Sequence, residues 1–201
     1  CPDYKNPGSE GCLVTIKDVK TKKDLMEQRV AIKGVVVSSL EKAGFFVQTA
    51  GGATDHGGLY CYAGKDGVLP KRGQIIDITG GTVTTFYDQK QVTAVTFKDT
   101  GKTETVTARE LDEAAVKQLV ETDKFDSIHD GLLIVVKSVE VTDDAPAPGA
   151  GSKDAINEFV VAGGLRVDDA IYTGDDYPKV KKGSILTSVT GPVSYRNGMM
   201  K

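Results

Sequence analysis

Two stretches in different halves of the chain are closely similar: KRGQIIDITGG at Lys71–Gly81 and KKGSILTSVTG at Lys181–Gly191. Each begins with two basic residues and a glycine, and each then alternates apolar with polar residues before a Thr-Gly pair. Such alternation is typical of a β-strand with one buried face. A sequence motif repeated in this way indicates two copies of one structural unit.

Other phrases recur in the same order around this repeat. VAIKGVVVSSL (Val30–Leu40) corresponds to LLIVVKSVEVT (Leu132–Thr142), and FFVQT (Phe45–Thr49) corresponds to EFVVA (Glu158–Ala162). Both copies also have two strands separated by a polar turn after the repeated phrase. Five short strands with glycine-rich turns favour a small closed barrel over a sandwich, which usually has about seven strands.

The order of these phrases resembles the OB-fold, a five-stranded Greek-key barrel. The pattern K-[KR]-G-x-I-[IL], followed by Thr-Gly, Val and Tyr, is similar to the fourth and fifth strands of OB domains in bacterial cell-surface lipoproteins and extracellular nucleases. The resemblance implies a mainly β protein with two tandem OB-like barrels, and it brings no catalytic residues. We expect a tether at residues 1–12, the first barrel at 13–100, and a linking helix with the second barrel at 101–201.

Three local signals refine this expectation. TARELDEAAVKQLVETD (Thr107–Asp123) predicts the linking helix, with Thr107 and Glu110 as its capping box. Gly34 interrupts a run of β-branched residues and predicts a bend in the first strand. The second unit has Lys137-Ser138 there, which predicts a gentler or displaced bend. Asn197-Gly198 is a strong hairpin signal.

Composition excludes some classes of function. The chain has 201 residues, of which 39% are hydrophobic and 26% charged, and its formal net charge is −3. This is an ordinary globular composition with no general basic field that would attract nucleic acid or an anionic membrane.

The three cysteines are Cys1, Cys12 and Cys61. A mature bacterial lipoprotein begins with the cysteine that carries its lipid. If Cys1 has that role, Cys12 and Cys61 remain as a pair that could form a disulfide. Alternatively, Cys1 bonds to Cys12, or all three are reduced. The polar segment after Cys1 suits a tether, so we predict an exported, surface-anchored protein attached to the membrane by an N-terminal lipid.

Aromatic and basic residues of the first unit form a candidate ligand surface. OB-folds bind oligonucleotides or oligosaccharides on one sheet face, where rings stack and cations neutralise charge. The alternative is that Phe46 and either Tyr60 or Tyr62 fill the barrel core. The net charge of −3 disfavours nucleic acid as the ligand. The candidate residues are Phe46, Tyr60, Tyr62, Tyr87, Lys71 and Arg72.

Acidic turns of the second unit form a weak candidate calcium site. Its residues are Asp168, Asp169, Asp175 and Asp176, although no EF-hand spacing is present and such turns are usually only solvated. The two histidines, His56 and His129, are too few for a zinc site without thiolate ligands. No nucleophile stands in a recognisable catalytic context, so we expect no enzyme activity and no cofactor.

These observations favour a non-enzymatic, exported cell-surface module for binding or assembly. The sequence stops at Met199-Met200-Lys201, part-way through the predicted fifth strand of the second unit. We therefore expect a partner at an incomplete strand edge, either another cell-surface protein or a second copy. The alternative function is an accessory nucleic-acid- or substrate-binding pair of domains in a longer extracellular nuclease or phosphatase.

Overall fold

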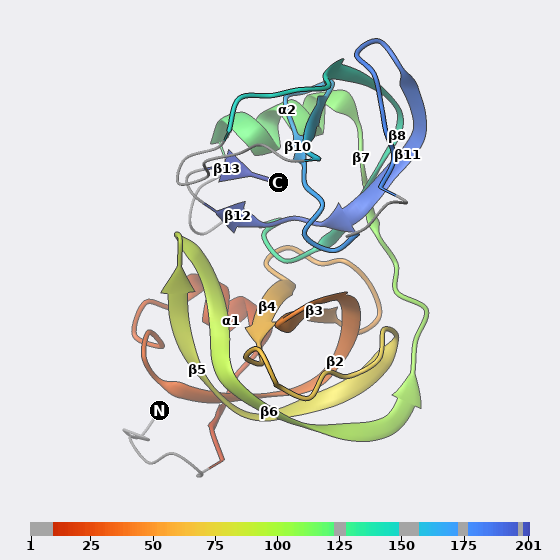
Figure 1. Ribbon diagram of the computed structural model, residues 1–201. Coiled ribbons are helices and arrows are strands. Elements are labelled where there is room, and N and C mark those ends of the chain that lie inside the picture. Colours follow the sequence, from red (N-terminus) through yellow and green to blue (C-terminus); the bar gives the residue numbers. More distant parts are fainter. Residues whose placement is uncertain (1–9, 123–127, 149–156, 173–176, 197–198) are drawn as a thin grey trace.

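The structure, a computed structural model, describes residues 10–122, 128–148, 157–172, 177–196 and 199–201. These residues form two units, one above the other, and each is built on a curved β-sheet (Figure 1). The predicted mainly β fold is confirmed, and the arrangement is consistent with tandem OB-like barrels. Two short helices accompany the strands, α1 (Ile16–Thr21) and α2 (Glu113–Thr122). Neither helix has the length and apolar character needed to span a membrane.

The first unit is a closed barrel. Its strands are β1 (Cys12–Leu13), β2 (Arg29–Glu41), β3 (Gly44–Thr49), β4 (Gly58–Tyr62), β5 (Gln74–Phe86) and β6 (Gln89–Thr103). They are ordered β1-β2-β3-β4-β6-β5, and β5 also pairs with β2, which closes the sheet on itself. Because β6 lies between β4 and β5, parallel to one and antiparallel to the other, the connection is a Greek key.

Alternating apolar residues fill this barrel. Val35 and Val37 of β2, Phe45 of β3 and Ile76 of β5 are all buried in one cluster. Strand β6 covers the cluster from the remaining side with Val92, Val95 and Phe97. The Phe97 ring meets the Phe45 ring edge-on, with centroids 5.7 Å apart. Strand β6 therefore supplies backbone hydrogen bonds to its neighbours and part of the apolar core.

The second unit is an open sheet in the part of the chain that the structure describes. Its strands are β7 (Arg109–Leu111), β8 (Leu133–Asp143), β9 (Phe159–Val161), β10 (Arg166–Val167), β11 (Ile185–Pro192), β12 (Tyr195–Arg196) and β13 (Met199–Met200). The main order is β10-β9-β8-β11, and β7 pairs with β8. Strands β12 and β13 pair with each other, on either side of the predicted Asn197-Gly198 turn, which lies outside the described residues.

The repeated phrase forms the same turn in both units. Gly73 and Gly183 have φ of 82° and 84°, a region that favours glycine. Gly73 N–H donates to the carbonyl of Val37 at 2.9 Å, and Gly183 N–H donates to the carbonyl of Val141 at 2.8 Å. After the Thr-Gly pair of the first unit, β5 continues to Phe86, with register shifts on both sides of Gly80.

The long first strands also bend at the same place. Gly34 has φ of 63° at a register shift between β2 and β5, as the sequence predicted. Ser138, at the matching place in β8, has φ of 49°. The bend is therefore not displaced in the second unit, because a serine adopts the left-handed conformation without a glycine there.

The linking helix is shorter than predicted. Residues Arg109–Leu111 form β7, paired in parallel with β8, so the capping box of Thr107 and Glu110 is wrong. Asp112 caps α2 instead, because its Oδ1 accepts a hydrogen bond from Ala115 N–H at 2.8 Å. Pairing with β8 outweighs the local helical signal of this segment.

Helix α1 was not predicted from the sequence. Its capping box is formed by Thr15 and Asp18: Asp18 N–H donates to Thr15 Oγ1 at 3.0 Å, and Thr15 N–H donates to Asp18 Oδ2 at 2.9 Å. The helix lies beside β4 and carries Lys20 towards the second unit.

Candidate binding groove

The predicted aromatic surface of the first unit is not assembled as one exposed face. Phe46 and Tyr60 are fully or almost fully buried and pack on each other with centroids 4.8 Å apart. Tyr62 remains 40% exposed. Tyr87 is 58% exposed at the β5–β6 turn, where it packs against Phe86. The four rings therefore do not form a continuous stacking platform.

The two basic residues of that prediction lie in the turn before β5. Lys71 is exposed, and its backbone N–H donates to Gln74 Oε1 at 2.6 Å. Arg72 is exposed, and its Nε donates to the carbonyl of Ser38 at 3.1 Å. Arg72 faces a groove that is lined mainly by the second unit.

This groove has a volume of about 810 Å³ and extends from the open sheet of the second unit to the edge of the first. Its floor is apolar and comes from β8, β9, β11 and the segments that follow β9 and β11. The first unit contributes β2, Phe46 and Arg72 at one side. The apolar residues of the floor are Ile134, Val136, Phe159, Leu165, Leu186, Val189 and Val193.

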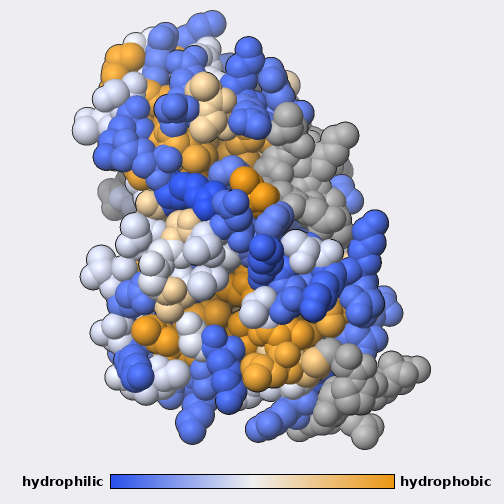
Figure 2. All heavy atoms as spheres, turned by 180° about the vertical axis from the view of Figure 1, so that it is seen from behind, coloured by the Kyte–Doolittle hydropathy of each residue, from blue (hydrophilic) through white to orange (hydrophobic). Residues whose placement is uncertain are grey.

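Apolar surface elsewhere is divided into smaller areas. Seen from behind, hydrophobic residues lie in several separate patches among hydrophilic ones on both units (Figure 2). Ile171 and Tyr172 are exposed at the groove, and the other exposed large apolar side chains are spread over the chain: Leu13, Tyr62, Val68, Phe86, Tyr87, Ile128 and Ile185. The groove is therefore the better candidate for a binding site.

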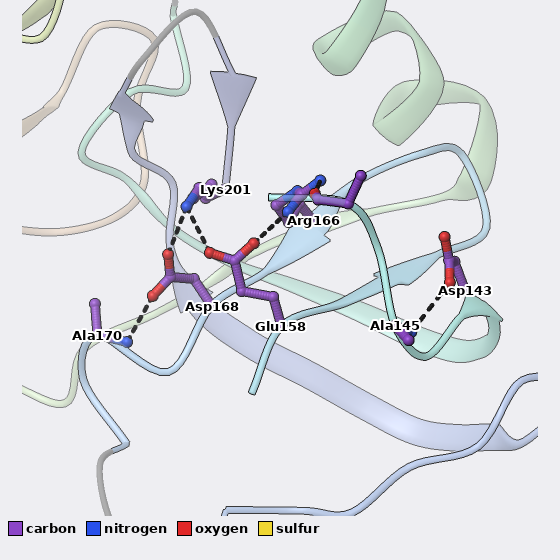
Figure 3. A network of polar contacts seen from close by, with 8 residues as sticks. Asp143, Ala145, Glu158, Arg166, Asp168, Ala170 and Lys201 are labelled. Atoms are coloured by element: carbon purple, nitrogen blue, oxygen red, sulfur yellow. Dashed lines mark hydrogen bonds and ion pairs between the residues drawn. The ribbon is translucent and has the colours of Figure 1, made fainter. Parts of the chain in front are cut away.

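A network of four charged side chains lies at the polar end of the groove (Figure 3). Lys201 Nζ lies 2.7 Å from Glu158 Oε1 and 2.8 Å from Asp168 Oδ2. Arg166 forms an ion pair with the other oxygen of Glu158. Two cations thus face two carboxylates, so the network is close to neutral and ties the end of β13 to β10.

The network shifts the pKa of two of its members. Burial opposes ionisation of Asp168, but the hydrogen bond and charge of Lys201 outweigh it and lower the pKa of this carboxyl. Burial likewise opposes the charge of Lys201, yet its two carboxylate partners raise its pKa. Both groups are therefore charged across the neutral range.

Three hydroxyl groups of the groove are buried and form no hydrogen bond with the described residues. They belong to Ser38, Tyr177 and Ser194. Desolvation, together with the nearby carboxylates of Asp169, Asp168 and Glu158, raises the pKa of Tyr177 above its usual range, so this phenol is a neutral donor. Unsatisfied polar atoms beside an apolar floor are suited to a ligand with a few polar groups.

The two described residues of the predicted calcium site, Asp168 and Asp169, both have protein partners. Asp168 is paired with Lys201, and Asp169 accepts a hydrogen bond from Asn157 Nδ2 at 3.1 Å. Asp175 and Asp176 lie outside the described residues. Among the residues that are described, no group of three or more possible metal ligands is present.

The predicted disulfide between Cys12 and Cys61 is wrong. Cys61 is a free thiol on β4, and it is fully buried in the core of the first barrel. Burial raises the pKa of this thiol well above its usual range, because a thiolate would lose its hydration. The predicted lipid acceptor, Cys1, lies outside the described residues.

The two histidines meet where the units join, an arrangement that the sequence did not predict. His56 N–H donates to the carbonyl of Ile128 at 3.0 Å. Desolvation and the nearby charge of Arg109 lower the pKa of His129, so its neutral form is favoured. Arg109 itself pairs with Asp55 at 2.9 Å.

Comparisons with known proteins give no family for this chain. No family model matches the sequence, and no curated protein matches it. A crystal structure described as an aspartyl-tRNA synthetase from Leishmania major Friedlin is similar at 13% identity, with a TM-score of 0.35. The similarity covers 60% of this chain and 26% of that one. A TM-score this low carries no argument about function, which must come from the site itself.

Proposed function

We propose that this chain is a non-enzymatic module for binding or assembly, and that it binds its partner in the groove of the second unit. The observation that carries the proposal is the difference between the two units. The first has a core sealed by β6, whereas the second leaves an apolar groove of about 810 Å³ open. This volume is within the usual range for ligand sites, about 300–1,000 Å³.

The groove also favours this function over the alternative of a nucleic-acid-binding accessory domain. Single-stranded nucleic acid needs exposed rings interleaved with cations. Phe46 and Tyr60 are buried, and the cations Arg166 and Lys201 are already paired with carboxylates. An apolar floor with few polar groups suits a polypeptide or another amphipathic ligand better.

An exported, lipid-anchored location is part of the proposal, and it rests on Cys1 and the polar segment that follows it. Expression with a bacterial export signal, followed by measurement of the intact mass, would test it. A mass increased by a diacylglycerol group on Cys1 supports the anchor, and an unmodified mass contradicts it.

Binding of the dye 8-anilinonaphthalene-1-sulfonate tests the groove itself. Ser188 lines the groove, whereas its exposed neighbour Thr187 does not, so Ser188→Trp and Thr187→Trp are a matched pair. We expect the native protein to increase the fluorescence of the dye. Ser188→Trp should reduce that increase, and Thr187→Trp should leave it unchanged. Equal dye binding by both variants, with equal thermal stability, would contradict the proposed site.

A further inference from the structure

We propose that the occupant of the groove is an extended β-strand from a partner protein. It takes the place that β6 fills beyond its first residues in the first unit, because β13 already lies where Gln89 and Lys90 would lie. The inference rests on the proposed function and specifies its ligand. Three observations support it: strand edges that are unpaired within the described residues, the open apolar floor, and the charged residues around the groove.

The first argument is the pairing of the strands. In the first unit, β6 bonds to both β4 and β5, which are the third and fourth strands of that barrel. In the second unit, the corresponding strands are β10 and β11. Within the described residues, β10 pairs only with β9 and β11 pairs only with β8. Each of these strands therefore has one edge whose backbone groups can pair with an added strand.

The second argument is the apolar floor. Val92, Val95 and Phe97 of β6 cover the first core. The floor of the groove is open where such residues would lie in the second unit, and Leu186 and Val189 of β11 are only partly buried there. The open backbone edges and the uncovered core thus lie at the same place. A strand with apolar residues at alternate positions satisfies both, whereas a small apolar ligand would leave the edges unpaired.

The third argument is charge, which also sets the direction of the strand. In the first unit, β5 and β6 are antiparallel, so the end of β6 lies beside the start of β5. Gln74 Nε2 at that start donates to Asp99 Oδ2 of β6 at 2.8 Å.

In the second unit, three exposed lysines precede β11: Lys179, Lys181 and Lys182. They form no ion pair with the described residues. The incoming strand therefore runs antiparallel to β11 and carries carboxylates near its C-terminal end.

A synthetic peptide with the sequence of residues 92–104, the part of β6 that β13 does not replace, provides a direct probe. It contains the apolar pattern of β6 and the carboxylates Asp99 and Glu104. The chain has no tryptophan, so Tyr172→Trp at the groove adds a single tryptophan whose emission can be excited selectively. We expect a saturable blue shift of its emission as peptide is added. Tyr62→Trp, which lies outside the groove, is the control and should not respond.

Hydrogen exchange of the protein with and without peptide tests the mode of binding. A strand added to β11 should slow exchange of those amides in residues 185–191 that do not face β8 by roughly tenfold or more, because they gain hydrogen-bond partners. A peptide with Asp99→Lys and Glu104→Lys should bind roughly three- to tenfold more weakly at low salt. A peptide with Val92, Val95 and Phe97 replaced by serine should not bind.

The outcomes separate this inference from the proposed function. If the dye binds in the groove but the peptide neither shifts Tyr172→Trp nor protects β11, the strand is wrong and the groove remains a site for another ligand. If neither dye nor peptide binds, both proposals fail. Protection of β11 that grows with protein concentration, together with dimers in sedimentation, would show that a second copy is the occupant and overturn the partner strand.

Discussion

Lys20 and Asp130 form an ion pair at the junction of the two units, and both side chains are almost completely buried, with exposures of 0% and 1%. Lys20 belongs to α1 of the first unit, and Asp130 lies in the segment between α2 and β8 of the second. Asp130 also accepts a hydrogen bond from Gln89 Nε2 at 3.0 Å, and Lys90 Nζ donates to the carbonyl of Lys20 at 2.8 Å. The pair therefore couples the folding of the two units.

Removal of one partner should be strongly destabilising. Asp130→Ala leaves the Lys20 ammonium buried without its counter-charge, so we expect a loss of about 3–5 kcal/mol in the free energy of unfolding. Urea denaturation measures it. Lys22→Met removes an exposed pair with Asp18 and should leave the free energy of unfolding nearly unchanged, because solvent screens such a pair. The double variant Lys20→Met, Asp130→Leu should recover part of the loss, and a loss below about 1 kcal/mol for Asp130→Ala would contradict the buried pair.

The junction should also be intolerant of a methyl group at Gly131. This residue has φ of 85°, and a Cβ there would lie 2.5 Å from the backbone nitrogen of Leu59 in the other unit. We expect Gly131→Ala to cost about 2 kcal/mol or more, because strain and steric overlap add. Gly191→Ala is the matched control, because its Cβ would meet no atom within 4 Å. Similar melting temperatures for both variants would mean that the backbones do not approach this closely.

The network at the polar end of the groove should make stability fall in acid. Lys201 lowers the pKa of Asp168 when the chain is folded, so the folded state binds fewer protons than the unfolded state. This contribution is complete above the unfolded pKa of about 3.9, and it is lost as pH falls through the lower folded value. Thermal unfolding between pH 2 and pH 7 measures it.

Lys201→Met is the informative variant for that experiment. Without Lys201, the pKa of Asp168 is no longer lowered by that residue, so the stability of the variant should fall less steeply in acid. The raised pKa of Lys201 adds stability that is complete below about pH 10.4 and is lost as pH rises through the folded value. An unchanged acid profile in Lys201→Met would show that Asp168 is held by other groups.

Cys61 should be inert to thiol reagents until the first barrel unfolds. In a variant with Cys1→Ser and Cys12→Ser, Cys61 is the single thiol, and burial keeps it protonated and inaccessible. We expect negligible reaction with Ellman's reagent in native buffer and complete reaction in denaturant. Reaction within minutes under native conditions would place the thiol outside the core.

Local sequence signals predicted many of the strands because they depend on short-range chemistry. The alternation in residues 71–81 and 181–191 requires one apolar face, and Gly73 and Gly183 permit the positive φ of the same turn. The helix start was mispredicted because Thr107 and Glu110 match a capping box, yet β8 recruits the following residues as a strand. Pairing with a strand that is distant in the sequence therefore outweighs the local propensity for a helix.

The candidate site depended on contacts that no local pattern reveals. Phe46, Tyr60 and Cys61 carried chemistry that suits a ligand surface or a disulfide, but tertiary packing buries all three. Asp168 was predicted as a candidate calcium ligand, and neither Glu158 nor Lys201 was assigned a role, yet the three side chains form one network. The one sequence signal for this network is that charged residues stand next to predicted buried strands.

The sequence by itself determined that this protein has two related, mainly β units, because the repeat, the alternation and the turn glycines are local properties of the chain. Only the tertiary structure decided that the first unit is sealed by β6 while the described part of the second leaves its sheet open. That difference depends on which strands find partners across the fold, and it is this long-range pairing that creates the groove.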